Sequence, residues 1–240
     1  NPRASDCDHS PSPILPLTTF SGSTAAEPLD SDLSARYDFG MVIHTPFHRY
    51  VMAVQRVEDR LKRVTAALNA AGVRYAVIGG NAVAVWVARK DPSATRSTVD
   101  VDLLVNQTDL QAVTGVFSRL GFERHDLRRL ILFTDPDEPS RRSGVHLVWA
   151  GQKVLPSYLH PTPTLDEAIY DEQQGFWVIA LVPLLRMKLT AFRDIDRAHV
   201  NDMLSVELID DQVRAALPPD LLERLRTIEA TAEENDLSGG

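Results

Sequence analysis

Two aspartates, Asp100 and Asp102, carry the clearest chemical signal in the sequence, because they alternate with apolar residues in the run 98–105. In a β-strand, such alternation places both carboxylates on one face, with their Cα atoms about 7 Å apart. Two carboxylates about 5 Å apart repel each other by roughly 3 kcal/mol at an effective dielectric constant of about 20. A divalent cation removes this cost, and oxygen ligands suit Mg²⁺ or Mn²⁺. The spacing therefore predicts a metal site on Asp100 and Asp102.

A pair of glycines about twenty residues earlier could hold phosphate groups. Gly79 and Gly80 follow an apolar run, 73–78, that predicts a buried strand, and they precede an Ala- and Val-rich run, 81–90, that predicts a helix. Glycine lets the backbone approach a phosphate closely, and the start of a helix offers free N–H groups and a positive dipole end. Asn81 could cap this helix or contact a phosphate oxygen.

The order of a strand, a Gly-Gly turn, a helix, a loop and an Asp-x-Asp strand resembles the nucleotidyltransferase superfamily. The resemblance extends over about residues 50–208, and it is nearest to bacterial minimal nucleotidyltransferases and to abortive-infection (AbiEii-type) toxin relatives. It implies an α+β fold, in which helices flank a nucleotidyltransferase-type mixed β-sheet and a helical extension follows. It also implies that Asp100 and Asp102 are catalytic metal ligands and that Gly79 and Gly80 hold the phosphates of a nucleoside triphosphate (NTP).

Two residues just before the aspartate strand, Arg96 and Thr98, are further candidate nucleotide ligands. Arginine can bind a phosphate with two parallel hydrogen bonds. The alternative interpretation of Arg96 is a solvated arginine in a loop.

Lys188, in a later helical segment, is also a candidate nucleotide ligand. It shares a stripe of three- and four-residue steps with Leu185 and Phe192, which should face the core. A lysine that points inward needs an anion. The resemblance favours a nucleotide phosphate or the aspartate pair as that anion, and an ion pair with Asp194 or Asp196 is the structural alternative.

The third carboxylate that is usual in the superfamily is missing from its expected strand. On the strand predicted over 144–151, the polar-face position is His146. A histidine could act as a base near neutral pH or as a metal ligand. Alternatively, catalysis has been lost while binding is kept, or His146 is structural. Asp135 and Asp137 lie in the preceding turn, and turn formation accounts for them.

The chain divides into segments of different composition. Residues 1–46 are polar and proline-containing without a sustained period, which predicts a disordered segment. A natural start near Met41 is one hypothesis. We expect a nucleotidyltransferase-like α/β core over 47–182, C-terminal helices packed on it over 183–232, and a frayed tail over 233–240.

Bulk composition limits the partners and the location. The formal net charge of −8 argues against an extended nucleic-acid surface. One arginine-rich stretch is either a solvated hairpin surface or a patch for RNA. Its members are Arg119, Arg124, Arg128, Arg129, Arg141 and Arg142. The absence of a long apolar run or a secretory signal, together with the single Cys7, predicts a cytoplasmic protein with no membrane segment.

These features predict a transferase that uses Mg²⁺ or Mn²⁺ to move a nucleoside monophosphate (NMP) from an NTP to an acceptor hydroxyl, with release of pyrophosphate. The acceptor is left open among RNA, a protein side chain and a small hydroxylated molecule. One alternative, motivated by His146, is a nucleotide-binding or regulatory module without catalysis. Another, which only the resemblance suggests, is a toxin–antitoxin component that acts through an antitoxin protein.

Overall fold

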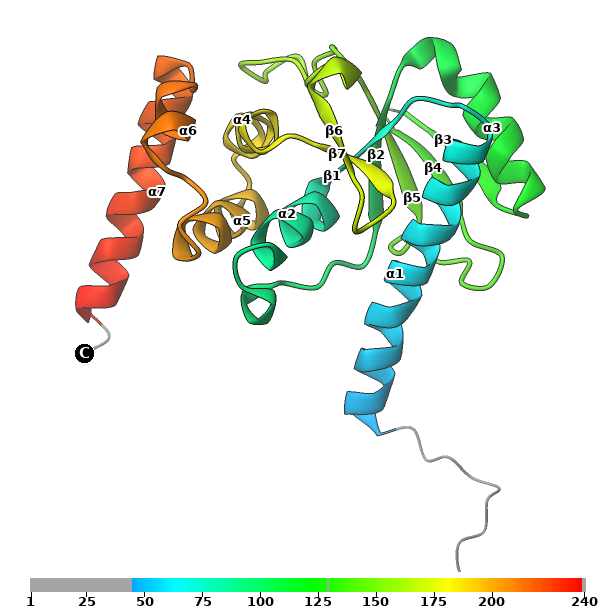
Figure 1. Ribbon diagram of the computed structural model, residues 1–240, viewed down its shortest axis with the longest axis horizontal. Helices are drawn as coiled ribbons and strands as arrows, with labels where there is room; N and C mark the ends of the chain where they lie inside the picture. The colour runs from blue at the N-terminus through cyan, green and yellow to red at the C-terminus, as the bar shows by residue number, and fades with distance from the viewer. Residues whose placement is uncertain (1–44, 129, 239–240) are drawn as a thin grey trace, which may run out of the picture. The chain divides into compact units, whose positions relative to one another are not determined.

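The computed structural model describes residues 45–128 and 130–238. The disorder predicted for residues 1–46 and the start hypothesised near Met41 lie outside the described residues, except at Thr45 and Pro46, where Pro46 begins a helix. A mixed sheet forms the centre of the described part, with the strand order β3-β4-β5-β2-β1-β7-β6 (Figure 1). The strands are β1 (Ala76–Ile78), β2 (Val101–Val105), β3 (Glu123–Leu127), β4 (Leu130–Thr134), β5 (Val145–Trp149), β6 (Ala168–Asp171) and β7 (Phe176–Ile179). The α-helices are α1 (Pro46–Ala70), α2 (Gly79–Ala88), α3 (Leu110–Arg119), α4 (Leu181–Ala191), α5 (Asp194–Ser205), α6 (Asp211–Ala215) and α7 (Pro219–Ser238).

The strand register brings the predicted motifs side by side. β2 lies between β1, to which it is antiparallel, and β5, to which it is parallel. Asp102 is therefore opposite Ile78, the last residue before the glycines, on one side and opposite His146 on the other. The end of β1 before the glycines, Asp102 of β2 and His146 of β5 thus lie next to one another in the sheet.

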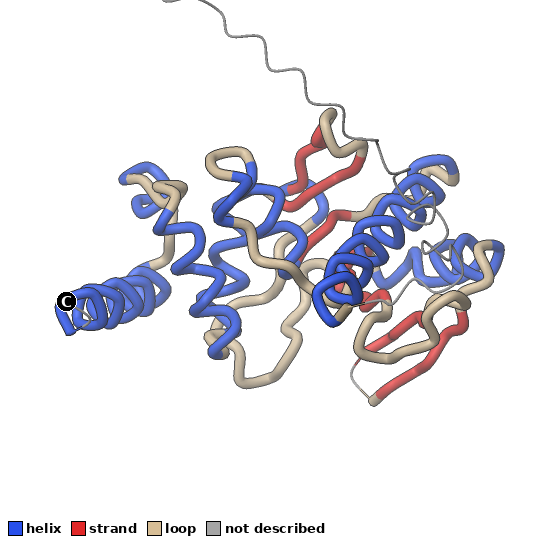
Figure 2. The backbone as a smooth tube through the Cα atoms, turned by 90° about the horizontal axis from the view of Figure 1, so that it is seen from below, coloured by secondary structure: helices blue, strands red, loops and turns tan. Residues whose placement is uncertain are grey.

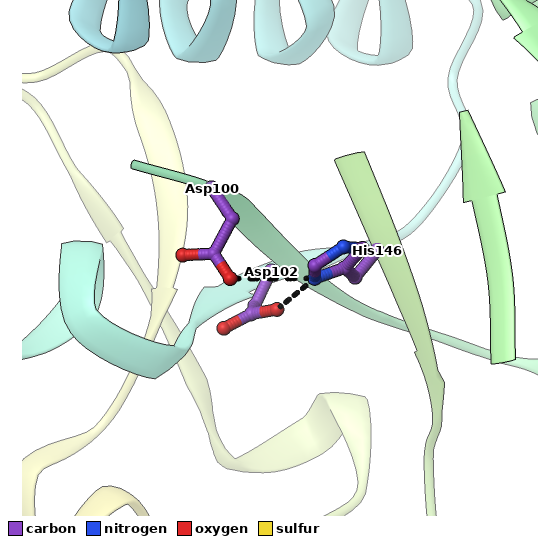
Figure 3. Close-up of side chains that lie close together, drawn as sticks. All are labelled: Asp100, Asp102 and His146. Carbon is purple, nitrogen blue, oxygen red and sulfur yellow. Dashed lines mark hydrogen bonds and ion pairs between the residues drawn. The ribbon is translucent and has the colours of Figure 1, made fainter. Parts of the chain in front are cut away.

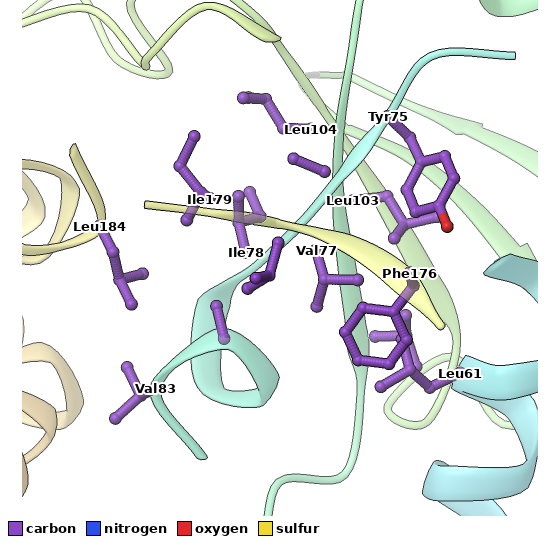
Figure 4. Close-up of a cluster of buried hydrophobic side chains, with 14 of the residues drawn as sticks. Leu61, Tyr75, Val77, Ile78, Val83, Leu103, Leu104, Phe176, Ile179 and Leu184 are labelled. Carbon is purple, nitrogen blue, oxygen red and sulfur yellow. The ribbon is translucent and has the colours of Figure 1, made fainter. Parts of the chain in front are cut away.

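Helices cover both faces of the sheet. α1 and α3 contact each other, and α1 also contacts β2 and β7, whereas α2 contacts α4 and α5 on the other side (Figures 1 and 2). Because side chains alternate along a strand, Val77 and Leu103 point toward Leu61 of α1, and Ile78 points toward Val83 of α2 (Figure 4). These apolar side chains are buried, and each contributes about 1.5–3 kcal/mol of burial free energy.

The predicted α+β class, a mixed sheet flanked by helices, is confirmed. The left-handed conformation of Phe192 (φ 53°) ends α4 before α5 begins. The last helix continues to Ser238, into the tail that the sequence predicts to be frayed. None of the described helices has both the length and the apolar character needed to cross a membrane.

Candidate functional site

A cavity of about 600 Å³ collects side chains from the β1–α2 turn, the loop before β2, strands β2 and β5, and the α4–α5 corner. It lies on the sheet face of Ile78, Asp102 and His146. The residues lining it that the sequence nominates are Gly79, Gly80, Thr98, Asp100, Asp102, His146 and Lys188. Asn81 and Arg96, which the sequence also nominates, are not among its lining residues.

His146 joins the two aspartates at one wall of this cavity (Figure 3). Its Nδ1 lies 3.4 Å from Oδ2 of Asp100 and 3.2 Å from Oδ1 of Asp102. The hydroxyl of Thr98 donates to Oδ1 of Asp100 at 2.8 Å. A positively charged imidazole therefore offsets the repulsion that the sequence predicts between the two carboxylates.

The protonation of this cluster follows from its geometry. Burial lowers the pKa of His146, but hydrogen bonds to Asp100 and Asp102 and their negative charges outweigh burial and raise this pKa to about 10. Burial raises the pKa of Asp100, but hydrogen bonds from His146 and Thr98 outweigh it, and the net shift is downward. His146 is therefore protonated at neutral pH in this arrangement, and it can act as a base or ligand only after it loses that proton.

The donor set fits a divalent cation. One ligand atom each from Asp100, Asp102 and His146 can lie within 4.8 Å of one another. Carboxylate oxygens suit both Mg²⁺ and Mn²⁺, whereas an imidazole nitrogen is more typical of transition metals. The set of two carboxylates and one histidine therefore favours Mn²⁺ over Mg²⁺ when the histidine is a ligand.

Gly79 is required by the position of Asp102. Its φ is +69°, and a Cβ added to it would lie 2.9 Å from Cβ and Cγ of Asp102 and closer still to Oδ2. The sequence predicts that a glycine is needed here so that a phosphate can approach the backbone. In the structure, the carboxylate of Asp102 lies beside Gly79. α2 begins at Gly79 itself, two residues before the predicted helix, and no side chain caps its first turn.

Asn81 and Arg96 contact other parts of the chain. The amide of Asn81 donates to the main-chain oxygen of Asp100 at 2.7 Å, which ties α2 to the start of β2. The guanidinium of Arg96 donates twice to Asp202, at 2.9 Å each, which ties the loop before β2 to α5. Their predicted phosphate contacts remain predictions, and for Arg96 such a contact requires the pair with Asp202 to open.

Lys188 is buried, as its helical stripe predicts, and its Nζ lies 3.2 Å from Oδ1 of Asp196. This is one of the two structural partners that the sequence leaves open. The other, Asp194, pairs with Arg197 instead. Lys188 also lines the cavity, so the ion pair does not remove it from the candidate site.

Asp135, a carboxylate of the turn before β5, lies away from the cavity lining. Nε of the buried Arg60 is 3.1 Å from its Oδ2, and Arg63 also pairs with it. Asp137 likewise pairs with Arg63. Both turn carboxylates thus fasten the β4–β5 connection to α1, and neither replaces the missing third carboxylate in the site.

Two cavity residues that sequence reasoning missed are Arg193 and His199. His199 is buried, and its Nδ1 has no hydrogen-bond partner among the described residues. Burial, together with the positive charge of Lys188, lowers the pKa of His199 to about 4. His199 lies three residues after Asp196, so both could share one face of a helix, and this spacing was the only hint in the sequence. In sequence, however, both residues look like parts of a solvated, charged helix face.

The rest of the cavity wall is largely aliphatic. Among its members are Val99, Val148, Val154, Met187 and Ile195. Val99, Val154 and Ile195 are substantially exposed, so the wall is open to solvent. The cavity therefore combines an acidic corner, a cationic corner and an apolar wall.

No protein-family model and no curated protein matches the chain. Among solved structures, it is similar to an antigenic nucleotidyltransferase-like protein from Paracoccidioides brasiliensis, with 19% identity, 77% of this chain and 91% of that chain covered, and a TM-score of 0.47. It is also similar to the antibiotic-resistance factor ANT(2'')-Ia in solution, with 13% identity, 78% and 90% covered, and a TM-score of 0.42. A crystal structure of ANT(2'')-Ia in complex with adenylyl-2''-tobramycin gives 14% identity, 76% and 94% covered, and a TM-score of 0.38.

The AbiEii subtype stays a prediction of the sequence. The solved structures that this chain resembles are nucleotidyltransferases or nucleotidyltransferase-like proteins.

Proposed function

We propose that the cavity binds an NTP together with a divalent cation and transfers its NMP to an acceptor hydroxyl. The observation that carries the proposal is the convergence of Asp100 and Asp102 beside the first turn of α2, in a cavity that also contains the buried Lys188. The cavity volume of about 600 Å³ is typical of small-molecule sites.

Each of these residues has a role in the proposed reaction. Carboxylate oxygens of Asp100 and Asp102 would hold the cation, which would supply positive charge to stabilise the negative charge that develops during the transfer. Gly79 and Gly80 begin α2, and the uncapped N–H groups of its first turn can donate to phosphate oxygens. Lys188 adds positive charge to the same cavity.

The transfer forms a bond between the acceptor oxygen and the α-phosphorus and breaks the bond from that phosphorus to pyrophosphate. The acceptor hydroxyl must lose its proton. Nδ1 of His146 can accept it once the carboxylate charges that hold the imidazolium proton are neutralised. RNA, a protein side chain and a small hydroxylated molecule remain the candidate acceptors, and an antitoxin remains a candidate partner.

A labelling experiment tests this function. The protein is incubated with each α-³²P-labelled NTP, Mg²⁺ or Mn²⁺, and a cell extract, and labelled product and pyrophosphate are measured. The double variant D100N/D102N should lose metal-dependent transfer. The matched control is D126N/D166N, in which both aspartates are exposed and outside the cavity lining. Full transfer by D100N/D102N would remove the proposal.

A second candidate function is a nucleotide-binding module that performs no transfer. The imidazolium of His146 between both aspartates favours it, because a positive charge there competes with a cation. Two measurements together distinguish the two functions: calorimetric titration with Mg–ATP measures binding, and incubation with extract for hours measures pyrophosphate release. Binding without release would favour the module, and release would favour the transferase.

A further inference from the structure

The corner between α4 and α5 carries a surplus positive charge. Asp196 is buried and accepts from two cations: Nε of Arg193 lies 2.7 Å from its Oδ2, and Nζ of Lys188 lies 3.2 Å from its Oδ1. One carboxylate therefore balances only one of two positive charges. His199, which also lines the cavity here, is neutral at pH 7 because its pKa is about 4.

Arg193 is exposed but fixed in direction. Its side chain is 65% exposed, yet both Nε and Nη2 donate to the carboxylate of Asp196, and its main-chain N–H donates to the same group at 3.3 Å. Within the described residues, no hydrogen bond engages its Nη1. The guanidinium thus lines the cavity with part of its donor set unused.

The backbone before Arg193 is held in an unfavourable conformation that directs this side chain. Phe192 has φ 53° and ψ 29°, a left-handed conformation that costs a non-glycine residue about 1–2 kcal/mol. The guanidinium carbons of Arg197 and Arg224 lie 5.5 and 4.9 Å from the centre of its ring. This bend ends α4 and makes Arg193 the first residue before α5, and such strain is frequent at binding sites.

The cavity therefore has two charged corners. The acidic corner holds the carboxylates of Asp100 and Asp102, whereas at the other corner Lys188 and Arg193 share the single carboxylate of Asp196. The negative charge of Asp102 contributes to the raised pKa of Arg193, after the larger effect of the Asp196 hydrogen bond, so the two corners interact. This layout matches an NTP whose α-phosphate lies at the aspartate pair with its cation and whose β- and γ-phosphates lie at the Asp196 corner.

We propose that Arg193 is a further nucleotide-binding residue, whose guanidinium donates to the β- and γ-phosphates of the NTP while Asp196 acts as the positioning residue. The proposal rests on the proposed function, which places the α-phosphate at the aspartate pair. Arginine suits this role because its planar fork matches phosphate oxygens.

Calorimetric titration with Mn–ATP and with Mn–AMP tests the contact. R193Q should weaken ATP binding by about 10–100-fold, the range expected for the loss of charged hydrogen bonds, but should change AMP binding by less than about 3-fold, because AMP lacks the β- and γ-phosphates. The control R226Q removes an exposed arginine of α7 that is not in the cavity lining, and it should bind both nucleotides as wild type does.

Asp196→Asn separates positioning from simple charge. If only net charge mattered, removing this negative charge would strengthen ATP binding. We expect the opposite: Asp196→Asn should weaken ATP binding, because the guanidinium of Arg193 loses the carboxylate that holds it in place. Arg193→Lys keeps the charge and should weaken ATP binding without affecting AMP, and it serves as the test if R193Q does not fold.

Several outcomes overturn the inference. ATP binding by R193Q or by R193K that equals wild type removes the contact, and so does an equal loss of ATP and AMP binding. Tighter ATP binding by Asp196→Asn removes the positioning role. If wild type binds neither Mn–ATP nor Mg–ATP, the proposed function itself fails, and the inference fails with it.

Discussion

Replacing Gly79 with alanine should disturb both stability and metal binding. Alanine at φ +69° costs about 1–2 kcal/mol for its left-handed backbone alone. The new methyl group would also lie 2.9 Å from Cβ and Cγ of Asp102, and β2 cannot retreat easily, because it pairs with a strand on each side. Overpacking of this kind costs a further 1–3 kcal/mol or so, which gives a total of about 2–5 kcal/mol.

Gly175 provides a matched control for this prediction. Its φ is +76°, and a Cβ added there meets nothing within 4 Å. Gly175→Ala should therefore cost only the backbone part, about 1–2 kcal/mol. The difference in free energy of unfolding between the two variants, measured by urea denaturation, isolates the contact with Asp102.

Metal affinity gives a second measurement on the same variants. Because G79A displaces a candidate ligand, its affinity for Mn²⁺ should fall by about 10–100-fold, as is usual when the surroundings of a metal ligand are altered. Gly175→Ala should bind Mn²⁺ as wild type does. If both variants lose the same stability and keep wild-type Mn²⁺ affinity, the reasoning that links Gly79 to Asp102 is refuted.

Two further predictions concern buried charged or titratable side chains. Arg60→Ala leaves the Asp135 carboxylate with less compensation and should lower the free energy of unfolding by about 3–5 kcal/mol, whereas Arg74→Ala, which removes an exposed pair with Asp166, should cost less than about 1 kcal/mol by the same urea assay. A similar loss in both variants would contradict this difference. His199 has a folded pKa of about 4 against 6.5 for the free side chain, so the fold favours its neutral form and its contribution to stability is lost as pH falls from 6.5 to 4. The urea midpoint of wild type should therefore fall more steeply in that window than that of His199→Gln, and parallel curves would show that His199 does not titrate as described.

Local sequence patterns predict the elements near the site well. The alternation around Asp100 and Asp102 places both carboxylates at His146, although β2 begins only at Val101. Pro219 is the first residue of the last helix, a position that suits proline because the missing N–H would have no helical partner there. These features follow from short-range rules, because strand alternation and the conformational limits of proline act within a few residues.

Edge strands are harder to predict. β3, with the sequence Glu-Arg-His-Asp-Leu, is mostly exposed and has no apolar face to reveal it. Its pairing with β4 supplies the hydrogen bonds that make it a strand. No pattern in the sequence predicts β3 or the short β6, because their stabilisation comes from pairing with neighbouring strands and not from their own residues.

The sequence by itself determined the aspartate pair on one face and the glycine turn before a helix, because each follows from the spacing of neighbouring residues. Its resemblance to the nucleotidyltransferase superfamily implied the α+β class. Only the tertiary structure decided that His146 is protonated between the two aspartates, that Asp102 occupies the space beside Gly79, and that Arg193 joins the cavity. Charge compensation and close approach depend on distances between residues far apart in the chain, and those distances exist only after strands and helices have packed.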